Sequence, residues 1–186
     1  NQGELYQQLA QANKELLRLS GEDRLTSLAN RHQFDQRILQ AWHHHQHNQL
    51  PLAAIFCDVD NFKAYNDLYG HSQGDDCLQH IAAVLQQSVK RPGDLVARYG
   101  GEEFVLLLPE TTAEGAQIVA HRVREDIHRL HIPHQGAKDG FVTVSLGVTS
   151  LVPNLDTSPR QLIEQADLAL YQVKQQGRDG IRVYGQ

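Results

Sequence analysis

Two aspartates stand where a short apolar run of the sequence ends and a polar stretch begins. The run Leu52–Cys57 is typical of a buried strand, and Asp58 and Asp60 follow it closely. Ligand sites in α/β proteins gather at strand ends, because loops converge there while the sheet holds them in place. Side chains alternate along a strand, so the two carboxylates could share one face. A second interpretation stays open, in which Asp60 caps a helix that starts at Asn61.

A second acidic cluster lies in the segment Gly100–Glu103, between the apolar runs Leu95–Tyr99 and Phe104–Leu108. Its two glycines permit a tight turn, so the two runs are expected to form a hairpin. If this hairpin lies beside the strand that ends at Asp58, three or four carboxylates converge on one spot. Such a cluster is favourable only around a divalent cation, and hard oxygen ligands suit Mg²⁺. Taken alone, the two glutamates are also compatible with a solubilising hairpin tip.

Asn66 and Asp75 offer the hydrogen-bonding groups that the edge of a guanine requires. Guanine presents an acceptor at O6 and donors at N1 and N2, so an amide and a carboxylate together select it over adenine. Asp75 could instead cap a helix that begins at Gly74. Lys174 and Arg178 lie four residues apart at the end of a long helical segment, so both face one way. They could clamp a polyphosphate, or merely complement the helix dipole.

The elements that must position these residues alternate between helices and short strands. Strands are expected at residues 52–58, 95–99, 104–108, 141–150 and 181–184. Helices are expected from Asn30 to about residue 47, then at 61–69, from Gly74 onward, at 112–130 and at 158–176. This order predicts an α/β (α+β) sandwich with a central mixed sheet and covering helices.

Residues 5–19 repeat apolar side chains with the spacing 4, 3, 4, 3, which is the seam pattern of a coiled coil. The seam residues are Leu5, Leu9, Ala12, Leu16 and Leu19. Two heptads are too few to dimerise well alone, so a helix that folds back on its own domain stays an alternative. We expect a signalling helix over residues 1–22 that continues toward a missing N-terminal module, followed by one domain at 23–186. The chain has no Met, even at position 1, which favours an excised fragment.

The composition is that of a globular chain of 186 residues, with 17 Lys and Arg against 22 Asp and Glu and a formal net charge of −5. An acidic chain is a poor non-specific binder of nucleic-acid polymers, so none is expected as a partner. The longest apolar runs are too short to cross a bilayer, so no membrane contact is expected from this segment. We expect a cytoplasmic domain, although the full-length protein could be membrane-anchored. The two cysteines are expected to be buried and reduced.

The run Trp42–His47 contains four histidines and invites a metal-site interpretation. Consecutive residues of a helix point in different directions and cannot chelate one ion together. We therefore expect a solvated helix end here.

Together, these segments resemble the GGDEF-domain diguanylate cyclases from about residue 23 to the C-terminus. The matching blocks occur in order and with matching spacing: 23–31, 58–63, Asn66-Asp67, Gly70-His71, Gly74-Asp75, 98–104, 145–148, Ala166-Asp167, 169–171, Lys174 and Gly177-Arg178. Two departures are visible. Ser27 replaces a usual glycine, and Asp179 replaces the asparagine expected after Arg178.

The resemblance implies a palm-like nucleotidyl-cyclase fold and the condensation of two GTP molecules into cyclic di-GMP and two pyrophosphates. It implies that Asp58, the Val59 carbonyl and Glu102 hold Mg²⁺, with Glu103 also at the metal site. Two ions per active site are expected, with Mn²⁺ as an alternative. Glu102 would help to deprotonate the attacking ribose 3′-hydroxyl, as metal-assisted phosphoryl transfer requires.

The same match implies the base and phosphate contacts. Asn66 and Asp75 would read guanine. Lys63, Lys174 and Arg178 would hold the phosphates, and Lys63 also counts among the catalytic residues. The remaining substrate-binding residues would be Asn61, Phe62, Gly100 and Gly101.

Arg91 and Asp94 fit the RxxD motif of product inhibition, with residues 95–99 between it and Gly100. An arginine fork can grip a phosphate or a guanine edge, and the aspartate can accept from guanine N–H groups. We therefore expect an inhibitory site for cyclic di-GMP. Catalysis implies a homodimer, since each domain holds one GTP. We also expect an upstream sensor domain outside this chain. The alternatives are a catalytically silent module that binds cyclic di-GMP or GTP, and a mononucleotide cyclase.

Overall fold

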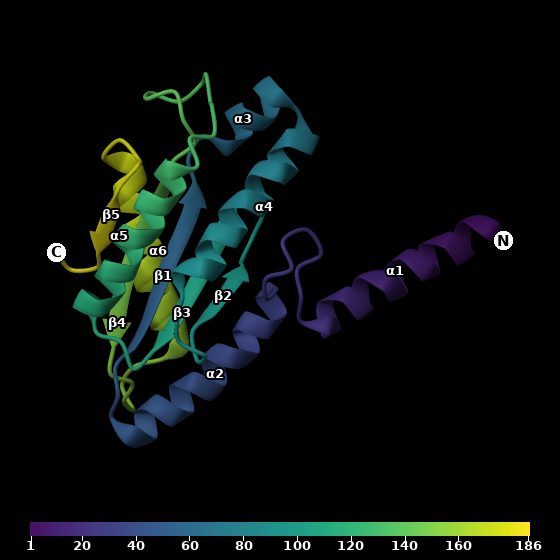
Figure 1. The fold of residues 1–186 in the computed structure, drawn as a ribbon. Coiled ribbons are helices and arrows are strands. Elements are labelled where there is room, and N and C mark those ends of the chain that lie inside the picture. Colours follow the sequence, from purple (N-terminus) through teal and green to yellow (C-terminus); the bar gives the residue numbers. More distant parts are fainter.

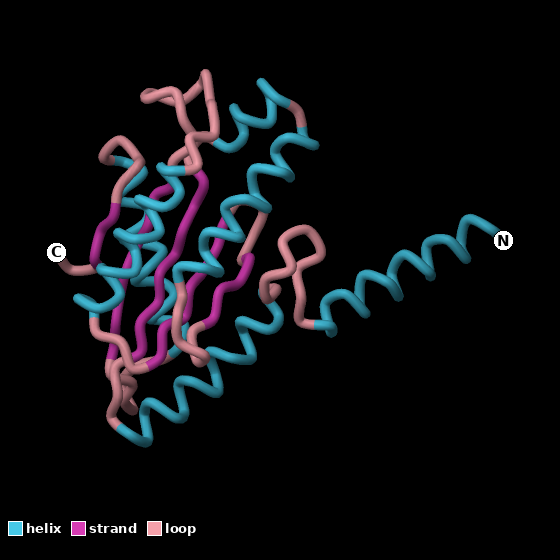
Figure 2. The backbone as a smooth tube through the Cα atoms, viewed as in Figure 1, coloured by secondary structure: helices cyan, strands magenta, loops and turns pink.

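A five-stranded sheet forms the centre of the molecule, which the computed structural model describes over residues 1–186 (Figure 1). The strands are β1 (Leu52–Val59), β2 (Leu95–Arg98), β3 (Glu103–Pro109), β4 (Val144–Leu151) and β5 (Ile181–Val183). Their order in the sheet is β2-β3-β1-β4-β5, and Figure 2 shows them side by side. Only β4 and β5 run parallel, so the sheet is mixed, which confirms the predicted fold class.

β1 is the central strand and is buried along its whole length. It pairs antiparallel with β3 on one side and with β4 on the other. A strand that is covered on both faces reads as a continuous apolar run, which is why Leu52–Cys57 is recognisable in the sequence. The C-terminal end of β1 is therefore a fixed platform, with Glu103 and Ser145 as the register partners of Asp58.

Helices cover both faces of the sheet (Figure 1). The chain has six helices: α1 (Gln2–Ser20), α2 (Arg31–Asn48), α3 (Phe62–Tyr69), α4 (His71–Ser88), α5 (Ala113–Arg129) and α6 (Pro159–Gln175), of which α1 does not contact the sheet. Side chains of β1 alternate between two apolar clusters: Ile55 lies in the larger one, with residues of α3, α4 and α5, and Phe56 in the smaller one, with residues of α2 and α6. The two layers fix where the ends of α3 and α6 lie relative to β1.

α1 extends away from the sheet as a separate arm (Figure 1). None of its residues is buried, and the seam leucines Leu5 and Leu16 are 58% and 65% exposed. The alternative in which this helix folds back on its own domain is therefore not what the structure shows. No helix of the chain is long and apolar enough to span a membrane.

Two element boundaries differ from the sequence-based expectation by more than one residue. α4 begins at His71 rather than Gly74; Gly70 at its start has φ 90° and ψ 160°, and no capping side chain marks the position. β4 begins at Val144 rather than Phe141, because Val142 instead donates its N–H to the Ile132 carbonyl in the preceding loop.

The histidine-rich end of α2 is not a wholly solvated surface, and that expectation was wrong for two residues. Trp42 and His45 are buried, and His45 bonds through both ring nitrogens, to the Ala41 carbonyl at 2.6 Å and the Glu110 N–H at 3.0 Å. Its role is to tie α2 to the end of β3. Both cysteines of the chain are free and buried, as expected.

Candidate active site

The hairpin between β2 and β3 brings its glutamates beside the end of β1. Asp58 is the register partner of Glu103, and the Val59 N–H donates to the Glu102 carbonyl at 3.2 Å. The Glu103 carbonyl closes the turn by accepting from the N–H groups of Tyr99 and Gly100, at 2.8 and 3.2 Å. The two acidic segments therefore lie together, as predicted from the sequence.

Lys174, in the last turn of α6, donates a hydrogen bond to the Asp58 carboxylate. The Asp58 side chain is 6% exposed and that of Lys174 is 34% exposed. Burial raises the pKa of Asp58 from 3.8 to about 6; the Lys174 ammonium opposes this rise, and the charges of Glu102 and Glu103 add to it. Lys174 therefore favours the ionised form of Asp58, whereas the burial of this carboxylate disfavours it.

A cavity of about 440 Å³ opens beside this ion pair. Its lining residues are Asp58, Val59, Asn61, Phe62, Lys63, Ala64, Asp67, Glu102, Lys174 and Arg178. The structure thus joins most of the predicted metal and phosphate residues in one space. Glu103, Gly100 and Gly101 lie in the adjoining hairpin and do not line the cavity.

The donors around this cavity fit a hard divalent cation without forming a closed cage. No group of three or more His, Cys, Asp or Glu side chains lies close enough together to hold a metal ion. Mg²⁺ usually binds one or two carboxylates and takes its other ligands from water and substrate phosphates. The Asp58 and Glu102 carboxylates and the Val59 carbonyl supply such oxygens. These residues fit Mg²⁺ that arrives together with a nucleotide.

Asn66 of α3 has a buried side-chain oxygen, Oδ1, with no hydrogen-bond partner. An unpaired buried polar atom is costly, so its presence calls for a reason. The atom faces Gly74 of α4 so closely that a Cβ added at Gly74 would stand 1.8 Å from it. Gly74 therefore leaves room for the Asn66 amide, whose oxygen has no hydrogen-bond partner within the chain.

Asp75 is exposed in the second turn of α4, one residue beyond Gly74. Because α4 begins at His71, Asp75 does not lie at the helix N-terminus. The expectation that the helix begins at Gly74 and the alternative that Asp75 caps it are therefore both wrong. Its carboxylate has no hydrogen-bond partner within the chain and is open to solvent. Asn66 thus belongs to α3, and Asp75 belongs to the adjacent helix α4, one residue beyond Gly74.

Asp60 is a buried carboxylate with a structural set of partners. It accepts from the hydroxyls of Thr143 (2.7 Å) and Ser145 (2.6 Å) and from the Asp179 N–H (3.0 Å). It does not cap α3, since the start of that helix has no side-chain cap, so this alternative is wrong. Asp60 instead ties the loop that carries Arg178 to the end of β1.

Comparison with known proteins gives a consistent result. The family model described as "Diguanylate cyclase, GGDEF domain" matches residues 20–180. The chain is 37% identical over 174 residues to Diguanylate cyclase A of Treponema denticola, covering 91% of this chain and 46% of that protein. It is 36% identical over 171 residues to the response regulator PleD of Caulobacter vibrioides, covering 89% of this chain and 36% of that protein. The chain belongs to the GGDEF-domain family of diguanylate cyclases.

Solved GGDEF domains share the fold. The GGDEF domain of DgcB from Caulobacter crescentus, solved in complex with c-di-GMP, aligns with a TM-score of 0.82 and 30% identity, covering 90% of this chain and 94% of that one. The active GGEEF domain of a diguanylate cyclase from Vibrio cholerae aligns with a TM-score of 0.75 and 30% identity, covering 86% of this chain and 99% of that one. Diguanylate cyclases of the GGDEF family are generally metal-dependent. The chain spans less than half of the length of both curated relatives.

A second cavity of this GGDEF domain, about 400 Å³, contains both residues of the predicted inhibitory motif. Arg91 donates to Asp94 Oδ1 at 3.0 Å and to the Pro109 carbonyl and Thr111 hydroxyl, both at 2.5 Å. Arg122 of α5 lines the same cavity, and its buried Nε has no partner. No sequence pattern marks Arg122, because it is one of three arginines on α5 and lies 31 positions beyond Arg91.

Proposed function

We propose that this GGDEF domain condenses two GTP molecules into cyclic di-GMP, with release of two pyrophosphates. The observation that supports this most directly is the cavity at the end of β1. There the Asp58 and Glu102 carboxylates face three cations, Lys63, Lys174 and Arg178. Opposite charges arranged around one space of this size suit a triphosphate with its metal.

The phosphates of GTP would be held by Lys63, Lys174 and Arg178. Asp58, the Val59 carbonyl, Glu102 and Glu103 would hold Mg²⁺, with two ions per site and Mn²⁺ as an alternative. When bound, these ions supply charge neutralisation for the triphosphate and for the attacking and leaving oxygens. An acidic chain can thus bind an anionic substrate, because the positive charge is local.

The reaction joins the ribose 3′-oxygen of one GTP to the α-phosphorus of the other. Glu102 would accept the 3′-hydroxyl proton, the new O–P bond would form, and the bond to pyrophosphate would break. Each domain holds one GTP, so two domains must face each other for both bonds to form. The working unit would therefore be a homodimer, with positioning of the two nucleotides as the main contribution of the protein.

Guanine selection would fall to Asn66 and Asp75. The unpaired Asn66 oxygen can accept from a guanine N–H group, and the Asp75 carboxylate can accept from others. Adenine offers no donor at the N1 position, so it would leave Asp75 unpaired. Asn61 and Phe62 line the cavity at the end of β1, which Asn66 and Asp75 do not line, and Gly100 and Gly101 would let the nucleotide approach the hairpin backbone.

The second cavity would bind cyclic di-GMP and limit its synthesis. Arg91, Asp94 and Arg122 combine two guanidinium groups with one carboxylate, which suits a guanine edge and a phosphate. The solved DgcB domain in complex with c-di-GMP shows that a protein of this fold binds the product. Residues 1–22 would act as a signalling helix between an upstream sensor domain and the catalytic domain at 23–186.

The decisive experiment incubates the purified chain with GTP and Mg²⁺ and separates the products by chromatography. Cyclic di-GMP and pyrophosphate in a ratio of one to two support the proposal. GTP that is bound but unchanged supports the silent module, and 3′,5′-cyclic GMP supports a mononucleotide cyclase. Because an isolated domain can dimerise poorly, the assay is run over a range of protein concentrations.

A further inference from the structure

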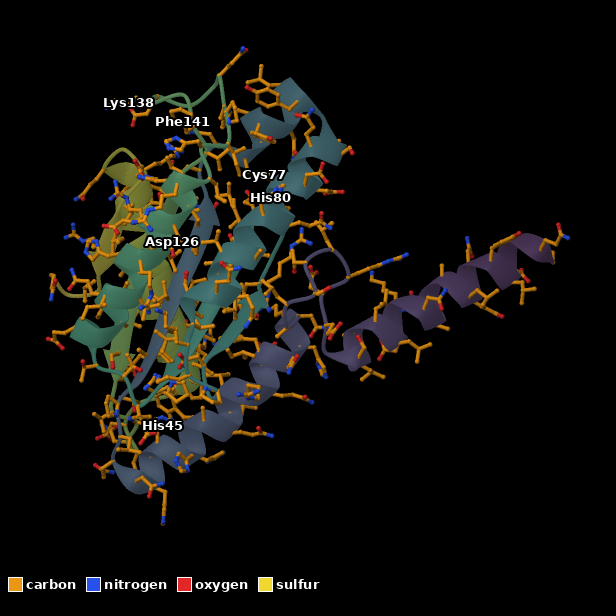
Figure 3. All side chains as sticks on the ribbon, in the orientation of Figure 1. His45, Cys77, His80, Asp126, Lys138 and Phe141 are labelled. Carbon is orange, nitrogen blue, oxygen red and sulfur yellow. The ribbon has the colours of Figure 1, made fainter.

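We propose that His134 is a positioning residue for GTP binding, which acts by fixing the start of α3. This inference rests on the proposed function, because α3 supplies Lys63 and Asn66 to the substrate site. His134 does not line the cavity itself. It lies in the segment 132–142 between α5 and β4, here called the strap, which is packed beside α3 (Figure 3, where Lys138 and Phe141 mark it).

The hydrogen bonds of His134 fix its tautomer. The ring is fully buried, and its Nδ1 accepts from the Gly136 N–H at 3.1 Å. Nδ1 therefore carries no proton, and Nε2, 3.1 Å from the Asn61 carbonyl, must be the donor of that contact. His134 thus holds the Asn61 carbonyl as a neutral, fully bonded side chain.

The Asn61 carbonyl is the first backbone acceptor of α3. It also accepts from the Tyr65 N–H at 3.0 Å, which begins the helix. Asn61 itself has φ +53°, a left-handed conformation that costs free energy in a residue other than glycine. α3 has only eight residues and cannot be stable alone, so its first turn depends on external contacts. The bond from His134 is such a contact.

The strap is well built for this role. It is closed on itself by hydrogen bonds from the His134 N–H to the Gly140 carbonyl (2.8 Å) and from the Val142 N–H to the Ile132 carbonyl (2.9 Å). It contacts α3 a second time, where the Gln135 N–H donates to the Tyr69 hydroxyl at 2.9 Å.

The His134 ring is also held by its neighbours. It stands edge-on to Tyr65, with ring centroids 5.3 Å apart. A Cβ at Gly136 would come within 2.9 Å of His134 Cε1, so a larger residue there would displace the ring. The strap therefore presents one rigid donor to α3.

The first test replaces His134 with Leu, which removes the donor and keeps an apolar side chain of similar size. Affinity for a non-hydrolysable GTP analogue, measured by calorimetry, is expected to fall about fivefold, the scale of one lost hydrogen bond. KM for GTP should rise by a similar factor while kcat changes less. The conservative variant His134→Gln, whose amide N–H can reach the same carbonyl, should restore most of the affinity.

His45→Leu is the matched control. His45 is also buried and bonded through both ring nitrogens, but it lies at the opposite end of the sheet from the strap (Figure 3). It should lower the melting temperature without weakening analogue binding. Equal weakening in both variants, or none in His134→Leu, would overturn the inference.

Two further measurements keep the test independent of folding and of the proposed function. If His134→Leu does not fold, Gly136→Ala displaces the ring instead, and unchanged analogue binding in that variant would overturn the inference. Amide exchange of the Tyr65 N–H, followed without nucleotide, should be faster in His134→Leu than in the unmodified chain. Unchanged exchange would contradict the role of His134 even if the chain makes no cyclic di-GMP, whereas a failed cyclase assay with faster exchange would refute only the proposed function.

Discussion

Lys174 of α6 donates a hydrogen bond to the buried Asp58 carboxylate of β1, from 116 positions further along the chain. The ammonium balances a carboxylate that we propose as a metal ligand, and it lies at a cavity that we propose for the triphosphate. With Mg²⁺ and nucleotide bound, Asp58 would be a metal ligand, and Lys174 would be free to bind a phosphate. The ion pair would then keep the empty site neutral until the substrate arrives.

We first predict that Asp58→Asn stabilises the metal-free domain at neutral pH while it abolishes turnover. The folded state raises the pKa of Asp58 from 3.8 to about 6, so it binds this proton more tightly than the unfolded state does. The contribution of Asp58 to stability is therefore largest below pH 4 and falls as pH rises through 6. The full effect is at most about 3 kcal/mol.

Thermal unfolding in EDTA at pH 7.5 and pH 4 measures this effect. The melting temperature of Asp58→Asn should exceed that of the unmodified chain at pH 7.5, and the difference should shrink at pH 4. A less stable variant at pH 7.5 would mean that the lost ion pair with Lys174 outweighs the burial of the charge.

The second prediction concerns the proton acceptor. Glu102→Gln should keep the fold and reduce turnover by at least about 100-fold, because the amide can neither take the 3′-hydroxyl proton nor bind a cation well. Glu114→Gln, at an exposed position of α5, is the control and should retain the unmodified rate. EDTA should stop the reaction, and added Mg²⁺ or Mn²⁺ should restore it. Substantial turnover by Glu102→Gln would remove this residue from the mechanism.

The strand that ends at Asp58 and the hairpin that carries Glu102 and Glu103 could each be predicted, because each depends on a local pattern. An apolar run marks the buried strand, and a Gly-Gly turn between two further runs marks the hairpin. That the hairpin lies beside this strand was only a condition of the sequence-based argument, which the pairing of β1 with β3 fulfils. The contact between Lys174 and Asp58 could not be predicted in this way. Helical periodicity gives the face of α6 on which Lys174 lies, but not the strand that this face covers.

His134 and Arg122 show the same limit. A single histidine in a polar loop and one arginine among several on a helix carry no pattern of their own. Their surroundings form only when the strap closes on α3 and when α5 packs against the sheet. The start of α4 was misplaced for a different reason: Gly70 starts the helix through its backbone conformation, and no capping side chain marks the position.

The third prediction tests the guanine pocket through Gly74. Gly74→Ala would place a Cβ 1.8 Å from Asn66 Oδ1 and force that amide to move. Affinity for GTP should fall about tenfold or more, although helix propensity alone favours alanine by about 1 kcal/mol. Asp75→Ala should weaken GTP binding by about 1–3 kcal/mol and relax the preference over other purine nucleotides. Calorimetry with GTP and ATP analogues measures both.

Gly115→Ala on α5 is the matched control for the glycine substitution, since it changes another helical glycine away from α3. It should leave GTP affinity unchanged. Unaltered guanine preference in both Gly74→Ala and Asp75→Ala would place the base elsewhere in the molecule.

The fourth prediction concerns acid stability. Burial alone would raise the pKa of Asp23, but hydrogen bonds from the Thr26 hydroxyl and N–H (2.7 and 3.0 Å) and the charge of Arg98 outweigh it and lower the pKa. Asp23 therefore contributes stability above the pKa of its unfolded form, near 4, and that contribution is lost as pH falls through the lower folded value.

Asp23→Asn should lower the urea concentration at the midpoint of unfolding at pH 7. As the pH falls from about 5 to about 3, this midpoint should decrease less in the variant than in the unmodified chain. Asp35→Asn is the control, because Asp35 is exposed and its ion pair with Arg31 is long, at 3.9 Å. Such surface pairs contribute little, so the midpoint should hardly change. If the urea midpoint of Asp23→Asn falls as steeply between about pH 5 and pH 3 as that of the unmodified chain, the prediction is wrong.

The last prediction is that cyclic di-GMP inhibits its own synthesis through Arg91 and Arg122. Arg91→Ala and Arg122→Ala should each keep the initial rate with GTP, since neither residue lines the substrate cavity. Added cyclic di-GMP should slow both variants much less than the unmodified chain. Each substitution removes a guanidinium group, whose planar set of donors even a lysine could not reproduce. Progress curves with and without added product measure this.

The two arginines are expected to contribute differently. Arg91 already uses its Nη2 group in hydrogen bonds to Asp94, Pro109 and Thr111, whereas Arg122 has a buried, unpaired Nε. A hydrogen bond from this Nε to the ligand would break no existing bond, so Arg122→Ala should cost at least as much inhibition as Arg91→Ala. Product inhibits only if it binds the inactive arrangement better than the active one, since equal affinity for both shifts no population. If the unmodified chain does not slow with added cyclic di-GMP, or both variants slow as it does, the second cavity is not a regulatory site.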